Sequence, residues 1–162
     1  GTVLTSTGTT PPLAFEAVAG SVAGTCHFRA YSDAVGWDTM SANEKCEFNQ
    51  VKLDGDGVYD TTNEWFEAPA DGVYLFGAHL YTLSSATESG FAFYVGEVEP
   101  DGVASGSGYE SMAYHYSSDS DDNLLVFSYV LTLSNADTVS VHANIAGDFY
   151  PPHSQWWGVR LK

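Results

Sequence analysis

Residues 51–80, VKLDGDGVYDTTNEWFEAPADGVYLFGAHL, constrain the fold of this chain more than any other segment. Apolar and polar residues alternate up to Leu53, where an Asp-Gly-Asp-Gly turn ends the first extended piece. A second piece begins at Trp65, and the chain then turns at Asp71-Gly72 into an aromatic-rich stretch. Alternation bounded by Asp-Gly turns indicates antiparallel strands joined by hairpins.

The same strand pattern continues through most of the chain, and no segment shows sustained helical periodicity. Residues 33–45 have little apolar periodicity and are expected to form a loop. We expect strands at 27–31, 48–53, 65–67, 73–83, 91–98, 112–116, 124–133, 138–143 and 156–161. Short strands at such spacings are typical of an all-β antiparallel sandwich.

The length of 162 residues and the hydrophobic fraction of 44% suit one domain with a sizeable core. No apolar run approaches the roughly 20 residues that span a bilayer, so no membrane insertion is expected. The start lacks the basic and apolar segments of a signal peptide. Residues 1–24, rich in Gly, Thr, Ser and Ala, are expected to form a stem or linker, and residues 25–162 the domain.

The charge balance is strongly acidic, with five Lys and Arg against 21 Asp and Glu and a formal net charge of −16. Five cations cannot assemble the basic surface that phosphate backbones require, so nucleic acid is excluded as a partner. Adsorption to anionic lipid is disfavoured for the same reason. An acidic surface instead attracts divalent cations.

Several landmarks occur in an order that resembles the C1q/TNF-like domain family. They are Tyr59-Asp60, Phe66, Pro69, Gly72, Tyr74, Phe76, Asp137-x-Val139-x-Val141 and Trp157-Gly158-Val159-x-Leu161. The resemblance implies a two-sheet jelly-roll sandwich that assembles as a homotrimer. It also implies a recognition head rather than an enzyme, and the absence of a G-x-S-x-G nucleophile elbow agrees with that.

The start of the chain is similar to a short segment that recurs before C-terminal domains of phage tail-fibre proteins. The similarity lies in residues 1–8 with Pro12 and Phe15, and Phe28-Arg29-Ala30-Tyr31 resembles the opening of phage-borne C1q-like domains. We therefore expect the receptor-binding tip of a virion tail fibre, which contacts a bacterial surface glycan or protein. Two alternatives stay open: a secreted invertebrate C1q-domain lectin of innate immunity, and a structural trimerisation cap of a fibre.

Aromatic side chains supply the candidate ligand-binding residues, because sugar faces stack on Trp and Tyr. The candidates are Trp37, Tyr109, Tyr114, Tyr116 and Trp156. Packing or trimer contact is the alternative role for each of them. Trp156 and Trp157 are adjacent on a strand and must point to opposite faces, so one belongs to the core and the other to a surface.

Two acidic clusters are candidate calcium ligands, because hard cations prefer carboxylate and carbonyl oxygens on turns. They comprise Asp54 and Asp56 in the first cluster, and Asp119, Asp121 and Asp122 in the second. Ca²⁺ is the single cofactor that the sequence suggests. Solvated acidic loops are the alternative interpretation.

Cys26 and Cys46 are separated by 19 residues, and two interpretations of the pair stay open. A disulfide between them would stabilise the fold by about 3 kcal/mol in the loop-entropy model. Two buried free thiols are equally compatible with the sequence. No C-x-x-C motif is present, which argues against a zinc site.

Overall fold

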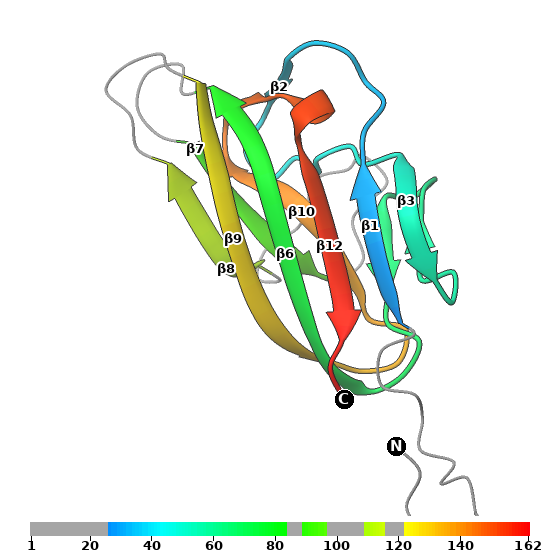
Figure 1. The fold of residues 1–162 in the computed structure, drawn as a ribbon. Coiled ribbons are helices and arrows are strands. Elements are labelled where there is room, and N and C mark those ends of the chain that lie inside the picture. The colour runs from blue at the N-terminus through cyan, green and yellow to red at the C-terminus, as the bar shows by residue number, and fades with distance from the viewer. Residues whose placement is uncertain (1–25, 84–88, 97–108, 116–121) are drawn as a thin grey trace, which may run out of the picture.

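The structure is a computed structural model that describes residues 26–83, 89–96, 109–115 and 122–162. These residues form two antiparallel β-sheets that face each other as a sandwich (Figure 1). The stem predicted at residues 1–24 lies outside the described residues. No helix in the described part of the chain is long and apolar enough to span a bilayer.

The larger sheet has seven strands, and its long central strand is β6 (Gly72–Leu83). One side of β6 pairs along its whole length with β9 (Asp122–Leu133), and the other pairs with two strands in succession. Near the C-terminal end of β6 the partner is β11 (Gly147–Phe149), which pairs in turn with β2 (Asp38–Met40). Along the rest of β6 the partner is β12 (Gln155–Arg160), followed outward by β1 (His27–Tyr31) and β3 (Gln50–Gly55).

The smaller sheet has five strands and lies behind the larger one in Figure 1. Its order is β4 (Tyr59–Asp60), β5 (Trp65–Glu67), β10 (Thr138–Ile145), β7 (Ser89–Val95) and β8 (Tyr109–His115). A 3₁₀ turn, η1 (Pro151–His153), connects β11 to β12.

The core between the sheets is built from aromatic rings. Phe28 lies at its centre, 5.0 Å from the ring of Tyr59, 5.3 Å from Phe66 and 4.6 Å from Trp156, measured between ring centroids. The Trp156 contact is edge-to-face, the geometry that the ring quadrupoles favour. These ring contacts join residues of both sheets into one buried core.

The alternation rule divides Trp156 and Trp157 between the two faces of β12. Trp156 is fully buried on the inner face, between Ala30 of β1 and Ala78 of β6, whose small side chains leave room for the indole. Trp157 is 37% exposed on the outer face and lies over Gly77. The prediction that Trp156 contacts a ligand is therefore wrong, because no ligand can reach it.

The two cysteines are free thiols, so the disulfide alternative is wrong for this structure. The carbonyl of Cys26 accepts a hydrogen bond from Arg160 in the larger sheet, whereas the amide of Cys46 donates to Val141 in the smaller sheet. Each thiol is therefore anchored beside a different sheet. Burial raises the pKa of Cys26 to about 11, with Asp56 adding to the effect, and it raises the pKa of Cys46 as well.

Candidate recognition surface

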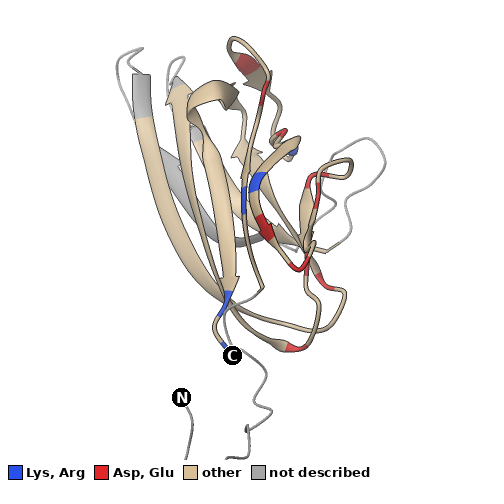
Figure 2. Ribbon diagram, turned by 45° about the vertical axis from the view of Figure 1, so that its right-hand side comes forward, with Lys and Arg blue, Asp and Glu red and all other residues tan. Residues whose placement is uncertain are grey.

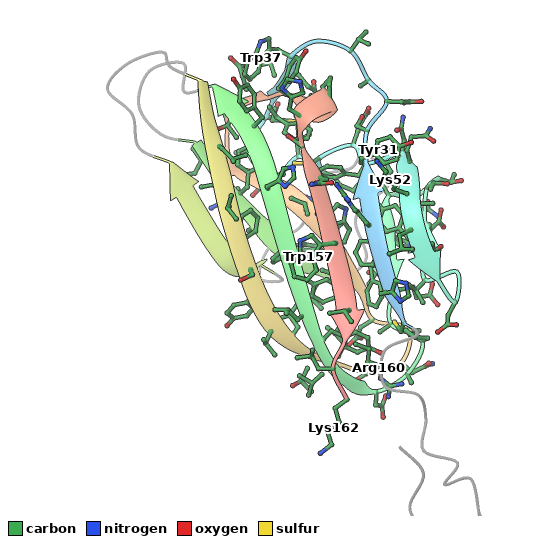
Figure 3. All side chains as sticks on the ribbon, viewed as in Figure 1. Tyr31, Trp37, Lys52, Trp157, Arg160 and Lys162 are labelled. Carbon is green, nitrogen blue, oxygen red and sulfur yellow. The ribbon has the colours of Figure 1, made fainter. Side chains whose placement is uncertain are left out.

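Four aromatic side chains gather at the end of the sandwich opposite the C-terminal residue Lys162 (Figure 3). This apical aromatic cluster consists of Trp37, Tyr81, Tyr150 and His153. The ring centroid of Trp37 lies 5.0 Å from that of Tyr150 and 5.8 Å from that of Tyr81. The His153 ring lies 4.9 Å from Tyr150 and 5.5 Å from Tyr81, so the four rings form one continuous group.

Backbone hydrogen bonds hold the cluster in place. The Tyr150 amide donates to the Tyr81 carbonyl at 2.8 Å. Ser154 joins the same two residues, since its hydroxyl donates to the Tyr150 carbonyl and accepts from the Tyr81 amide, both at 2.8 Å. Trp37 is 42% exposed above these partners, so an aromatic face is presented to solvent on a fixed support. Such a surface suits sugar rings or apolar side chains of a partner.

A cavity of about 390 Å³ lies next to the cluster on the outer face of the larger sheet. This cationic pocket is lined by Arg29, Tyr31, Lys52, His79, His153 and Gln155, among others. Tyr31 and Lys52 extend from β1 and β3 on the face turned to the viewer in Figure 3. Burial lowers the pKa of His79, and the nearby charge of Arg29 lowers it further.

Apolar side chains cover another part of the same outer face. This outer apolar face comprises Leu124, Val126 and Val130 of β9 and Trp157 of β12. The three β9 side chains are 60%, 66% and 51% exposed, a high exposure for a row of aliphatic residues on one strand. They lie opposite Tyr81, His79 and Leu75 in the β6 register.

Among the side chains that the structure describes, the acidic ones lie away from this face. The strands β1, β6 and β12 contain neither Asp nor Glu. Figure 2 shows the described acidic residues mainly on loops and short strands at the other side of the molecule. The described acidic residues are therefore unevenly distributed over the surface.

The predicted metal ligands are only partly described. Asp54 uses its carboxylate within its own turn, where it accepts the Val58 amide at 2.8 Å, and Asp56 has the left-handed φ of 73° that this turn requires. Asp119 and Asp121 lie outside the described residues, as does the side chain of Asp122 at the start of β9. The described residues contain no group of three or more His, Cys, Asp or Glu that could hold a metal ion. Calcium binding stays a prediction.

Of the predicted aromatic ligand residues, the structure places Trp37 on an accessible surface. Tyr109 and Tyr114 lie on β8, but their side chains fall outside the description, as does Tyr116 entirely. Sequence reasoning missed Tyr81 and Tyr150, because Tyr81 continues a long strand and reads as packing. The sequence Tyr150-Pro151-Pro152-His153 was the available signal, since prolines favour a turn and these two stand between two aromatic residues.

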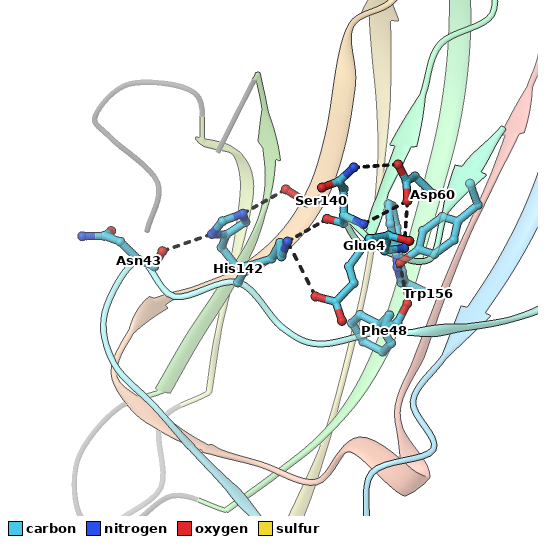
Figure 4. Close-up of polar contacts among 11 residues, drawn as sticks. Asn43, Phe48, Asp60, Glu64, Ser140, His142 and Trp156 are labelled. Carbon is cyan, nitrogen blue, oxygen red and sulfur yellow. Dashed lines mark hydrogen bonds and ion pairs between the residues drawn. The ribbon is translucent and has the colours of Figure 1, made fainter. Parts of the chain in front are cut away.

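A Ser–His pair in the smaller sheet has a structural role. Ser140 Oγ lies 2.9 Å from His142 Nε2, and His142 Nδ1 lies 3.1 Å from the Asn43 carbonyl (Figure 4). A carbonyl can only accept, so Nδ1 carries the proton and Nε2 accepts from the serine hydroxyl. Burial lowers the pKa of His142 to about 4. Both side chains are at most 1% exposed, so a substrate cannot reach this serine.

No protein-family model matches the chain. The chain is 36% identical over 63 residues to the uncharacterized protein YqcC of Bacillus subtilis (strain 168). That match covers 39% of this chain and 17% of the Bacillus protein, so this chain spans a small part of its relative's length.

Solved structures resemble almost the whole described domain. The globular domain of zebrafish complement 1qA matches with a TM-score of 0.62 and 15% identity over 85% of this chain and 97% of that one. Eiger TNF from S. frugiperda matches with a TM-score of 0.66 and 16% identity, over 85% and 92%. Murine APRIL matches with a TM-score of 0.60 and 14% identity, over 84% and 98%. The fold is thus a C1q/TNF-like jelly roll, as the sequence landmarks predicted.

Proposed function

We propose that this chain is a non-enzymatic, homotrimeric recognition head whose apical aromatic cluster contacts a glycan or protein on a cell surface. The observation that carries the proposal is the pairing of two surfaces on one rigid fold. The outer apolar face offers a surface for self-assembly, and the cluster offers an accessible aromatic surface at one end. Three copies of a weak site on one head bind a repetitive surface far more tightly than one copy.

Self-assembly through the outer apolar face is supported by exposure and charge together. Water-exposed Leu124, Val126 and Val130 gain free energy when a second copy covers them, at roughly 25 cal/mol per Å² of apolar surface. The neighbouring strands β1, β6 and β12 contain no Asp or Glu, so they add no repulsion at this contact between chains that each carry a net charge of −16. The C1q/TNF-like fold, predicted from its landmarks to trimerise, makes three the expected number of copies.

We assign the head to the tip of a phage tail fibre, in an extracellular setting on the virion. The stem-like start of the sequence supports this assignment, as does the sequence similarity to a Bacillus protein, which favours a bacterial or phage setting over an invertebrate lectin. A trimerisation cap that binds nothing is the competing function, and binding experiments separate the two.

The assembly is tested by the solution mass of residues 1–162, measured by light scattering with and without EDTA. We expect the mass of three 17.4 kDa chains. Loss of that mass in EDTA would place Ca²⁺ at the subunit interface. A monomer under both conditions would contradict the trimer and, with it, the avidity argument.

The recognition site is tested by Trp37→Ala in a cell-binding assay. A labelled head is bound to a panel of bacterial cells that includes Bacillus subtilis. We expect the variant to lose at least about tenfold in apparent affinity, because each of the three subunits loses its Trp37 ring from the site at the same time. Its melting temperature should stay within a few degrees of the parent, since Trp37 is 42% exposed.

Val35→Ala is the matched control for this experiment. Val35 precedes Trp37 in the same loop and is 93% exposed, so its loss should leave both cell binding and stability unchanged. Equal cell binding by Trp37→Ala and the parent would remove the cluster from the site. Binding to no cell by the parent head would favour the trimerisation cap.

A further inference from the structure

The cationic pocket lies within the surface that self-assembly covers. In the strand register, Arg29 of β1 lies opposite Trp157 of β12, and His79 of β6 lies opposite Val126 of β9. Trp157 and Val126 belong to the outer apolar face, and residues opposite each other on antiparallel strands share one face of the sheet. A second copy that covers the outer apolar face therefore covers the pocket as well.

The positive charge of the pocket is not neutralised by the described part of the chain. Arg29 and Lys52, two of the five Lys and Arg residues, line the pocket together with side chains that carry no negative charge. Neither residue forms an ion pair with any residue that the structure describes. Asp33, a short distance along the chain, already accepts hydrogen bonds from Asn49 at 2.8 Å and Gln50 at 3.0 Å. Two cations thus stand in the pocket without a described anion beside them.

A β-bulge brings Lys52 into the pocket. In the β1–β3 register Arg29 lies opposite Leu53 and Ala30 lies opposite Val51, which leaves Lys52 as the extra residue. A bulge of this kind redirects a side chain and is common beside functional sites. Regular pairing would give Lys52 a partner residue on β1, whereas the bulge leaves it unpaired next to the Arg29 position.

The guanidinium of Arg29 is oriented by a chain of hydrogen bonds. Its Nε donates to Gln155 Oε1, and Gln155 Nε2 donates in turn to His79 Nδ1 at 3.0 Å. His79 is further hydrogen-bonded to the backbone of His153. These contacts leave the Nη donors of Arg29, the pair that suits a carboxylate, without a partner among the described residues.

Assembly changes the surroundings of this charge. Arg29 and Lys52 are exposed in the single chain, and a covering subunit would take them out of water. A guanidinium keeps its proton in proteins, so Arg29 cannot become neutral when it is covered. A charge that is buried without a partner is strongly destabilising, whereas one that meets an opposite charge with good hydrogen-bond geometry is tolerated. The covering surface must therefore bring an anion to Arg29.

A second copy of this chain offers carboxylates in excess, with 21 Asp and Glu residues. The same face of that copy cannot supply one from β1, β6 or β12, because these strands contain no Asp or Glu. A different surface of the neighbour must meet the pocket, and the described acidic residues lie mainly on loops and short strands at the other side of the molecule (Figure 2). Contact between two different surfaces is the kind that closes a ring of subunits.

We propose that the cationic pocket is an intersubunit site, in which Arg29 and Lys52 of each chain form ion pairs with a carboxylate of the next chain in the trimer. The site is complete only when the neighbour contributes this carboxylate. The inference rests on the proposed function, because it needs the trimer, and it adds a charged contact that favours a threefold ring over a twofold dimer. Salt screens an enclosed ion pair much less than exposed charges, so the pair persists at physiological ionic strength.

Cross-linking tests whether the pocket meets a neighbouring chain. Trimers are assembled from isotope-labelled and unlabelled chains, treated with a carbodiimide, which joins an ammonium to a carboxylate that it touches, and digested for mass spectrometry. We expect Lys52 to be joined to an acidic peptide, with one partner labelled and the other unlabelled in part of the product. Lys45 is the control, because its Nζ lies 3.6 Å from Glu64 of the same chain and should give no such mixed product.

Substitution of Arg29 tests whether the contact stabilises the assembly. We expect Arg29→Gln to raise the concentration at which half of the trimer dissociates by at least about tenfold, because the neighbour's carboxylate is left without its partner. The circular dichroism spectrum should not change, since Arg29 is exposed in the single chain. Lys162→Gln removes the same charge at the C-terminal end, away from Tyr31 and Lys52 of the pocket, and should assemble like the parent (Figure 3).

Charge reversal separates an ion pair from a loss of packing. Arg29→Glu should abolish assembly, because it brings two negative groups together. A change of the cross-linked acidic residue to Arg in the same chain should restore the trimer. Failure of this second change to restore assembly would overturn the inference.

Several other results would also overturn it. Lys52 that gives no cross-link in an intact trimer, or cross-links only within its own chain, would show that no neighbouring carboxylate reaches the pocket. Arg29→Gln that assembles like the parent would have the same meaning. An equal loss of assembly in Lys162→Gln would assign the effect to net charge. A trimer that forms only with added inorganic phosphate would assign the pocket to an anion from solution.

Failure of this inference is distinguishable from failure of the proposed function. A parent chain that is monomeric in light scattering removes the trimer and this inference with it. A trimeric parent that gives any of the contrary results above removes the intersubunit ion pairs alone. A trimer with mixed Lys52 cross-links that binds no cell retains the ion pairs and loses the recognition function.

Discussion

At the scale of single residues, His142 couples folding to pH. Burial lowers its folded-state pKa from 6.5 to about 4. Between these pH values His142 is protonated in the unfolded chain and neutral in the folded chain. Stability contributed by neutral His142 is therefore complete above about pH 6.5 and is lost as pH falls toward 4. The full loss corresponds to about 3 kcal/mol, at 1.36 kcal/mol for each pKa unit.

Urea unfolding of the parent and of His142→Asn at several pH values between about 7 and 5 isolates this effect. Burial raises the pKa of Asp38 and Glu64, which works in the opposite direction, but those groups are present in both proteins. We expect the variant to be less stable at neutral pH and the gap between the two proteins to narrow as pH falls. A gap that is independent of pH would contradict the neutral, buried state of His142.

Gly158 and Gly77 give a matched pair for testing how tightly β12 and β6 pack. A Cβ at Gly158 would lie 2.6 Å from ring atoms of both Phe28 and Phe76, which are buried and cannot retreat. We expect Gly158→Ala to lower the free energy of unfolding by about 1–3 kcal/mol or more. A Cβ at Gly77 meets the Trp157 indole, which is partly exposed and can swing outward, so Gly77→Ala should cost less. Equal losses in denaturant unfolding would contradict this distinction.

At the scale of elements, β9 is the strand on which assembly depends. Its even-numbered residues from Leu124 to Val130 face outward, while Leu131 and Leu133 are buried. We expect Val126→Asp to convert the trimer to monomer in light scattering and to leave the circular dichroism spectrum unchanged, because the side chain is 66% exposed. Val35→Asp adds the same charge outside this face and should remain trimeric. A trimeric Val126→Asp would move the interface elsewhere.

Strand prediction from the sequence succeeded for a run of five alternating residues and for one shorter run bounded by turn signals. The expected strands at 27–31 and 65–67 coincide with β1 and β5, the second because Pro69 and the Asp71-Gly72 turn delimit it. The sequence missed β2, β4 and β11, which contain two or three residues each and carry no periodicity of their own. Such strands form because a neighbouring strand offers unpaired backbone N–H and C=O groups. The position of that neighbour depends on the whole fold and is not shown by the two or three residues of the strand itself.

The candidate site was only partly predictable for a related reason. Trp37 stood out as an aromatic residue in a loop, and the structure places it on an accessible surface. The choice of Trp156 over Trp157 was wrong because alternation does not say which face is inner; the small partners Ala30 and Ala78 decide it. Arg29 and Lys52 came together through a bulge between two strands, and a single-sequence pattern does not show a bulge of this kind.

At the scale of the whole molecule, net charge opposes assembly. Three chains of −16 carry −48 together, so long-range repulsion should weaken the trimer in dilute buffer. The Debye length falls from about 30 Å at 10 mM salt to about 8 Å at 150 mM, which screens this repulsion. We expect the trimer dissociation constant, from light scattering over a dilution series, to decrease as salt rises. An increase would indicate an interface held by ion pairs rather than by apolar contact.

The two ends of the folded domain meet at one pole. The Cys26 carbonyl accepts a hydrogen bond from the Arg160 amide, so the first described residue adjoins the last strand, and Trp37 lies at the far pole (Figure 3). A sensor chip or bead coupled through Lys162 would thus display the aromatic residues toward the sample. Immobilised in this way, the domain would serve as an oriented capture reagent without any redesign of its loops.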